Sequence, residues 1–165
     1  MLRVSKLADY GSVLMVQLAR HRDAVLTATD LAEKTRIKLP TVSKLLKLLA
    51  KRNLLESHRG VNGGYGLARA PEEISIAEII QAVEGKPALT ECSFHAGDCA
   101  LEPICEIRGN WRLISDAVYA ALDSVSLAKL ANPSMKITSV DVKKITGLGK
   151  VSQRGVSDDR SSGTR

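Results

Sequence analysis

The apolar residues in the first third of the chain recur at intervals of three or four positions in three separate runs. This spacing gathers them on one face of a helix, so it predicts helices over about 5–21, 29–35 and 40–52. Asp30 followed by Glu33 is typical of a capping pair, and we expect it to begin the second helix. The chain is therefore predicted to start with three short helices.

The third of these helices has two chemically different faces. One face is apolar, whereas lysines and small polar residues lie elsewhere around the helix. Two short helices with a tight link, the second of them basic on one side, predict a helix-turn-helix that binds DNA. The expected inward residues are Val42, Leu45, Leu46 and Leu49.

The position of each polar residue on the third helix suggests its contact with DNA. Residues near the start of a recognition helix reach base edges in the major groove, and later cations meet phosphates. The expected base contacts are Thr41, Ser43 and Lys44. The expected phosphate contacts are Lys47, Lys51 and Arg52.

A glycine-rich hairpin is predicted directly after the helix-turn-helix. The stretch LLESHRGVNGGYGLAR has a short apolar start, three glycines within 63–66 and a second strand-like piece. Glycine tolerates the positive φ of a tight turn, so the stretch predicts the β-hairpin wing of a winged helix. Arg59 and Asn62 are expected at its tip and Arg69 at its exit. The alternative, a phosphate-binding loop, needs a following helix with Lys and Ser or Thr, which LARAPEE lacks.

Further helices are predicted downstream of the wing. The stretch SIAEIIQAVEG predicts a helix over about 75–84 that ends at Gly85, and Ser126 is suited to cap a short final helix, LAKLA. A long helix is expected from Pro103. Its apolar stripe could be buried in the protein's own core, but we expect it to pair with a second copy. The stripe consists of Ile104, Ile107, Trp111, Ile114, Val118, Ala121 or Leu122, and Val125.

Charge is unevenly distributed along the chain. The 165 residues carry a net charge of +6, and positions 1–69 contain thirteen Lys or Arg against five Asp or Glu. Positions 70–135 contain four against ten, and positions 136–165 contain seven against three. A basic segment beside an acidic one favours a nucleic-acid-binding part and a separate regulatory or assembly part.

Membrane proteins and enzymes fit the sequence poorly. No run reaches the roughly 18–20 consecutive apolar residues of a membrane span, and charged positions interrupt the N-terminal stretch, unlike a signal peptide. We therefore expect a cytoplasmic protein without a membrane partner. His21, His58 and His95 are scattered and have no evident nucleophile or acid as a neighbour in sequence, so an enzyme is not expected.

All three cysteines, Cys92, Cys99 and Cys105, lie in one short stretch, CSFHAGDCALEPIC. An odd number in a cytoplasmic chain does not suit a disulfide framework. The spacing also lacks the closely paired cysteines of structural zinc sites and the C-x-x-C of redox motifs. Iron–sulfur clusters accept thiolates from looser loops. The spacing alone leaves metal ligands, redox-sensing thiols and inert thiols open.

Five stretches together resemble a known family. They are RVSKLADYG, LTATDLAEKTRIKLPTVSKLLKLLAKRNLLES, RGVNGGYGLAR, SIAEIIQAVEG and, after the cysteines, NWRLISDAVYAALDSVSLAKL. Over about residues 1–131 the chain resembles the IscR- and NsrR-like winged-helix regulators of bacteria, which carry an iron–sulfur cluster. Within that family it is most similar to the regulators of the SUF iron–sulfur assembly operon. The specific wing motif R-G-x-x-G-G-Y-x-L is matched by Arg59, Gly60, Gly63, Gly64, Tyr65 and Leu67.

The resemblance implies a mainly α fold, with a winged helix-turn-helix domain, a small β-hairpin wing and a long C-terminal dimerisation helix. It implies a DNA-binding domain over 1–85, a cluster-binding loop over 86–105 and a dimerisation helix with a short final helix over 106–135. The polar, basic composition of positions 136–165 predicts a tail that we expect to be disordered. The implied partners are a second copy and a roughly palindromic double-stranded DNA operator. The implied function is repression of a SUF operon, with Arg59 in the minor groove.

The resemblance also implies the cluster ligands, which would be Cys92, Cys99, Cys105 and one further residue. The IscR type has a histidine three positions after the third cysteine, where this chain has Arg108, which cannot coordinate iron. The NsrR type uses an aspartate near the N-terminus of the partner subunit, and Asp9 in SKLADYG matches that position. The alternatives for the fourth ligand are His95, Glu106 and Glu102.

Two questions stay open within the resemblance. The loop is one residue longer between its first two cysteines than the commonest family spacing, so the cluster could be 2Fe-2S or 4Fe-4S. The alternative function is a nitric-oxide-responsive, thiol-redox or zinc-bound regulator of the same fold.

Overall fold

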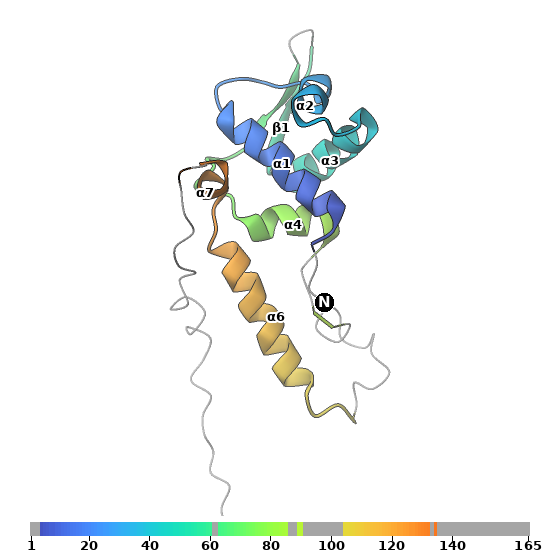
Figure 1. Ribbon diagram of the computed structural model, residues 1–165, viewed down its shortest axis with the longest axis vertical. Helices are drawn as coiled ribbons and strands as arrows, with labels where there is room; N and C mark the ends of the chain where they lie inside the picture. The colour runs from blue at the N-terminus through green and yellow to red at the C-terminus, as the bar shows by residue number, and fades with distance from the viewer. Residues whose placement is uncertain (1–3, 61–62, 86–88, 91–103, 133, 135–165) are drawn as a thin grey trace, which may run out of the picture.

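The computed structural model describes residues 4–60, 63–85, 89–90, 104–132 and 134. Its elements in chain order are α1 (Lys6–Arg20), α2 (Ala28–Thr35), α3 (Leu39–Lys51), β1 (Leu55–His58), β2 (Gly64–Leu67), α4 (Ile76–Glu84), α6 (Arg108–Asp123) and α7 (Leu127–Ala131). The strands form one antiparallel hairpin between α3 and α4, which confirms the predicted winged, mainly helical fold (Figure 1). Among the described residues, no helix combines the length and the apolar character needed to cross a bilayer. The predicted tail and most of the predicted cluster-binding loop lie outside the described residues.

Side-chain caps determine where the first two helices begin. The Ser5 hydroxyl accepts a backbone hydrogen bond of 3.3 Å in the first turn of α1. The expected Asp30–Glu33 capping pair is wrong, because Thr27 is the N-cap of α2. Thr27 Oγ1 accepts from Asp30 N at 3.1 Å, and Asp30 Oδ2 accepts from Thr27 N at 2.9 Å. This reciprocal capping box starts α2 earlier than predicted, and the hydrogen bond from the Thr27 hydroxyl lowers the pKa of Asp30.

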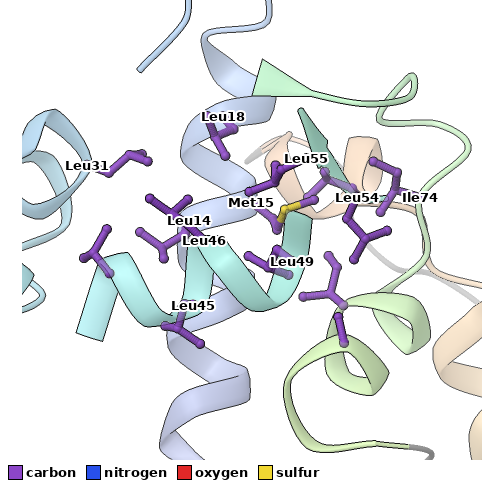
Figure 2. Close-up of a cluster of buried hydrophobic side chains, with 14 of the residues drawn as sticks. Leu14, Met15, Leu18, Leu31, Leu45, Leu46, Leu49, Leu54, Leu55 and Ile74 are labelled. Carbon is purple, nitrogen blue, oxygen red and sulfur yellow. The ribbon is translucent and has the colours of Figure 1, made fainter. Parts of the chain in front are cut away.

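The core forms where α3 crosses α1 (Figure 2). Val42, Leu45, Leu46 and Leu49 are fully buried, which confirms the predicted inward stripe of α3. Burying each of these side chains contributes about 1.5–3 kcal/mol, so the stripe fixes which face of α3 points outward. The residues that pack around the stripe include Leu14, Met15, Leu18, Leu31, Leu54, Leu55, Ile74, Ile79 and Leu127.

The wing is joined to the segment that precedes α2. Leu26 pairs with the outer edge of β2, because Leu26 N donates to Tyr65 O at 3.1 Å and Tyr65 N donates to Leu26 O at 2.8 Å. The sequence did not predict this bridge. It brings the two backbones so close that a Cβ on Gly64 would lie 2.6 Å from the Leu26 carbonyl oxygen. The second glycine of the GG pair is therefore required by the docking of the wing.

α6 extends away from the winged domain (Figure 1). The sequence predicts this helix from Pro103, but it begins at Arg108. Positions 104–107 contain two β-branched isoleucines, and no side chain among the described residues caps the helix, which accounts for the later start. The final helix α7 forms as predicted, with Ser126 as its cap, and it returns to α1, where Leu127 is fully buried in the core.

A chain of polar side chains links α6 to the start of α4 and to the wing. The Ser75 hydroxyl caps α4 by accepting from Glu78 N at 3.2 Å, and it donates to Asp123 Oδ1 at 2.7 Å. Glu78 accepts in turn from Ser75 N at 2.9 Å, and its other oxygen pairs with Arg69 at 2.7 Å. We call Arg69, Glu78, Ser75 and Asp123 the polar joint. It connects the exit of the wing to the last turn of α6.

Backbone hydrogen bonds hold the same corner. Ile76 N donates to Val125 O at 2.9 Å, and Leu127 N donates to Ile74 O at 2.7 Å. The C-terminal end of α6 is thus attached to the winged domain by both side chains and backbone, whereas its N-terminal end projects from it (Figure 1).

Gly64→Ala is expected to destabilise the protein by about 1–3 kcal/mol, because the added Cβ would collide with the Leu26 backbone. The free energy of unfolding, measured with urea and circular dichroism, checks this. Gly109→Ala in α6 is the matched control, since nothing lies within 4 Å of a Cβ there. In the helix that change should stabilise by about 0.5–1 kcal/mol. Equal effects of the two substitutions would contradict the close approach.

Glu78→Gln is expected to change how stability depends on pH. Burial alone would raise the pKa of Glu78, but hydrogen bonds from Ser75 and Arg69 outweigh it and lower the pKa from its ordinary 4.5. A carboxyl with a lowered pKa binds fewer protons folded than unfolded, so it stabilises the fold above pH 4.5. That contribution disappears as the pH falls through the folded-state pKa.

The variant should therefore be less stable than wild type at pH 7 and approach it below about pH 4. Urea unfolding over this range measures the difference. Glu33→Gln on the exposed face of α2 is the control, and it should follow the wild-type curve. A constant gap between Glu78→Gln and wild type at all pH values would show that the carboxylate of Glu78 has no special role.

Candidate nucleic-acid interface and cluster ligands

α3 presents its lysines on the side opposite the core. Lys44, Lys47 and Lys51 are exposed, whereas Thr41 and Ser43 are half-buried at the flanks of the buried stripe. The predicted base-edge and phosphate residues thus occur on the outward and flanking surfaces of one helix. A cationic outer face with short polar flanks suits a polyanionic duplex.

Further cations, which were not predicted to contact DNA, surround the N-terminus of α3. α2 ends at Arg36, whose φ of 59° turns the chain, and Lys38 then occupies the N-cap position of α3. Both side chains are exposed, as is Lys34 in the last turn of α2. The alternating cations in the stretch KTRIK could have predicted this basic turn from the sequence. They make the turn between the two helices basic as well.

The wing adds one more cation. Arg59 is exposed and directly follows β1, and the next residue, Gly60, has a φ of 110° that favours glycine. Arg59 is the one Lys or Arg among residues 55–60 and 63–67 of the wing. Arg69 is at the exit as predicted, but it belongs to the polar joint. Asn62 lies outside the described residues.

The proposed cluster ligands are described only in part. Cys105 is a half-buried free thiol in the turn before α6. Within the described residues, no three His, Cys, Asp or Glu side chains are gathered closely enough to hold a metal ion. The remaining candidates outside the described residues are Cys92, Cys99, His95 and Glu102.

Asp9 lies in the first turn of α1 and is exposed. Among the described residues its carboxylate has no hydrogen-bond or ion-pair partner. The first turn of α1 belongs to the winged domain, whereas Cys105 precedes the far end of α6, and Figure 1 shows these two helix starts well apart. The structure of one chain therefore does not bring Asp9 and Cys105 together. Glu106, the other described alternative, is exposed beside Cys105.

The first half of α6 and the turn before it leave large apolar side chains exposed. Their exposed fractions are 77% for Ile104, 56% for Ile107, 37% for Trp111, 57% for Leu113 and 46% for Ile114. Four of these five residues belong to the stripe predicted for dimerisation. An apolar patch of this kind usually marks a contact surface.

The chain matches the model of a known protein family over residues 4–133, nearly the whole of its described part. That family is Rrf2, described as an iron-dependent transcriptional regulator.

Individual relatives agree with this match. The chain is 32% identical to the HTH-type transcriptional regulator IscR of Photorhabdus laumondii, over 79% of this chain and 80% of that protein. It is 30% identical to the regulator NsrR of Halalkalibacterium halodurans, over 78% of this chain and 90% of that protein.

Solved structures share the fold. The cysteine regulator CymR of B. subtilis has a TM-score of 0.63 and 30% identity, over 79% of this chain and 97% of CymR. The T. potens IscR structure has a TM-score of 0.62 and 27% identity, over 84% of this chain and 94% of that chain. With its winged helix-turn-helix and basic α3, the chain belongs to the Rrf2 family of DNA-binding transcriptional regulators and is not an enzyme.

Proposed function

We propose that this regulator senses an iron–sulfur cluster and represses a SUF iron–sulfur assembly operon. The observation that carries the proposal is the occurrence, in one Rrf2 chain, of three thiols ahead of α6 together with the basic surface of α3 and the wing. In this proposal the thiols sense the iron–sulfur supply, and the basic surface of α3 and the wing binds a promoter in the bacterial cytoplasm.

In this proposal α3 enters the major groove and the wing lies along the neighbouring minor groove. Thr41, Ser43 and Lys44 contact base edges, while Lys47 and Lys51 neutralise phosphates. The exposed guanidinium of Arg59 inserts into the minor groove, where a narrow A·T-rich segment has the most negative potential.

The proposed partner of the exposed α6 face is a second copy of the chain. Two-fold pairing of α6 would bury the apolar residues that a single chain leaves in water. It would also set two copies of α3 at a fixed separation, so the operator is expected to be roughly palindromic with half-sites spaced by helical turns.

The donor set has the chemistry of an iron–sulfur site. Three thiols, Cys92, Cys99 and Cys105, match the soft ligands that such clusters prefer, and Asp9 offers a free carboxylate. Because the start of α1 is far from Cys105 within one chain, Asp9 of the partner subunit is the proposed fourth ligand. When bound, the cluster supplies a link between the two subunits that is sensitive to iron and to oxidants. The residues of this chain then hold α6 and α1 of the partner in one arrangement.

The polar joint offers a route from this arrangement to DNA. Asp123 at the end of α6 contacts Ser75, and Glu78 continues the contact to Arg69 at the exit of the wing. A change in the angle of α6 would therefore act on the wing as well as on the spacing of the two α3 helices. The cluster can change operator affinity only by as much as its own affinity differs between the two arrangements of the dimer.

A regulator that responds to thiol chemistry without a cluster is the second candidate. It is favoured by the similarity to CymR, a protein described as a global cysteine regulator and also solved in an oxidized form from Staphylococcus aureus. Nitric-oxide-responsive or zinc-bound sensing at the same cysteines belongs to the same alternative. Iron, zinc and sulfide analysis of protein purified without oxygen separates these candidates.

Lys47→Ala is expected to reduce the salt dependence of operator binding by about one unit in the slope of log K against log salt, because one phosphate contact is lost. Arg59→Ala should weaken binding by about 1–3 kcal/mol. Fluorescence anisotropy at several salt concentrations measures both. Lys129→Ala on α7 is the control, since its exposed cation lies on a different element. If the slope is the same for Lys47→Ala and wild type, Lys47 does not meet a phosphate.

Mixed dimers test the cluster and the fourth ligand together. Cys105→Ala is expected to abolish the visible absorbance of anaerobically purified protein, and Asp9→Ala should alter its resonance Raman spectrum. We then co-express Cys105→Ala and Asp9→Ala chains with different affinity tags. If Asp9 is donated by the partner, the mixed dimer contains one intact site, made by the cysteines of one chain and Asp9 of the other.

The mixed dimer should thus regain a wild-type spectrum at about half occupancy. If Asp9 acted within its own chain, the mixed dimer would retain the spectrum of the Asp9→Ala protein. Wild-type protein that contains no sulfide under these conditions would exclude the cluster and favour the thiol-based alternative.

A further inference from the structure

The first turn of α3 carries an apolar tip that the contacts above do not use. Leu39 is 44% exposed, and Pro40 beside it is also exposed. They sit at the N-terminal end of the helix, next to the exposed Lys38. We call Leu39 and Pro40 the apolar tip.

The helical positions of these residues decide where they point. Pro40, Lys44, Lys47 and Lys51 are separated by four, three and four residues, so they form one stripe along α3. All four are exposed, and the buried stripe lies on the other side of the helix. Pro40 therefore heads the face that carries the outward lysines, and Leu39 lies beside it, one turn before Ser43.

The surroundings of the tip favour an anionic partner. The exposed cations Arg36, Lys38 and Lys44 lie around it in sequence, and the first turn of α3 contains no Asp or Glu. A two-fold contact with the same tip of a second copy would bring like charges together and be repelled. A duplex is instead attracted by these cations, and the N-terminal residues of a recognition helix are those that reach base edges.

The chemistry of the tip limits what it can read there. Leucine has no hydrogen-bonding group in its side chain, and proline lacks even a backbone N–H. The apolar group that base pairs present in the major groove is the C5-methyl of thymine. We propose that Leu39 and Pro40 contact thymine methyl groups in each half-site and so contribute specificity by apolar contact. This inference deepens the DNA interface proposed above and rests on it.

Replacing thymine by deoxyuridine tests the proposal, because it removes the methyl and keeps every hydrogen-bonding group. Operators are first selected in vitro with the wild-type protein. Each thymine is then replaced, at the same position in both half-sites, and dissociation constants are measured. Wild type should lose about fourfold in affinity per methyl at one or more positions, or about 15-fold for both half-sites. Leu39→Ala/Pro40→Ala should bind the thymine and deoxyuridine operators equally.

Two controls make the result specific. Leu39→Met keeps an apolar side chain of similar volume, so it should retain the preference for thymine and show that the tip still folds. Lys47→Ala should weaken binding to both operators equally. The proposal is overturned if no deoxyuridine substitution affects wild type, if the selected half-site contains no thymine, or if the double variant keeps the wild-type preference. A failure of the DNA interface itself would appear separately, as an unchanged salt slope for Lys47→Ala.

Discussion

The burial of one apolar stripe of α3 is the constraint on which the rest of the molecule depends. Val42, Leu45, Leu46 and Leu49 are fully buried against α1 and its neighbours. A helix is rigid, so burial of one face fixes the orientation of the opposite face. The lysines between the buried residues therefore point outward. A one-residue rotation of α3 would bury a lysine without a partner, which is far more costly than losing a methyl contact. The orientation of the basic face of α3, the proposed DNA-binding surface, is thus a consequence of the core.

The same core determines how α6 can influence that surface. Leu127 of α7 is buried with the α1 and α3 residues, so the end of α6 is tied to the winged domain a few residues after Asp123. The polar joint then connects Asp123 through Ser75 and Glu78 to Arg69. A movement of α6 must either break these short hydrogen bonds or carry the start of α4 with it. Polar links of this kind have defined geometries, so they transmit a change of angle better than loosely packed apolar contacts do.

The sequence predicted elements with strong local signals and missed those that depend on distant partners. The stripe of α3, the glycine hairpin and the cap at Ser126 follow from spacing and residue type. The start of α2 was misplaced, although Thr27 three residues before Asp30 was a readable signal. The pairing of Leu26 with Tyr65 and the contact of Ser75 with Asp123 were not readable, because residues far apart in the chain make them.

The residues of the candidate site also divide into those with a local signal and those without one. Helical periodicity predicted the outward lysines, and the same local signal could have predicted the cations of the α2–α3 turn. The relation between Asp9 and Cys105 could not, because it depends on the direction in which α6 leaves the winged domain.

The direction in which α6 leaves the winged domain also affects how the charges of the chain would act near DNA. The cations of α2, α3 and Arg59 belong to the helix-turn-helix and the wing, whereas the described carboxylates of positions 70–132 belong to α4, α6 and the segments around them. In the negative field of a duplex such a molecule experiences a torque that turns α3 and the wing toward the DNA and α6 away from it. The exposed apolar face of α6 would then remain free for the proposed second copy, and Cys105 in the turn before α6 would stay away from the phosphates. A thiolate site close to α3 would oppose DNA binding by its own negative charge. In the proposed function, the length of α6 would therefore let one chain combine an anionic sensor with a cationic DNA-binding surface.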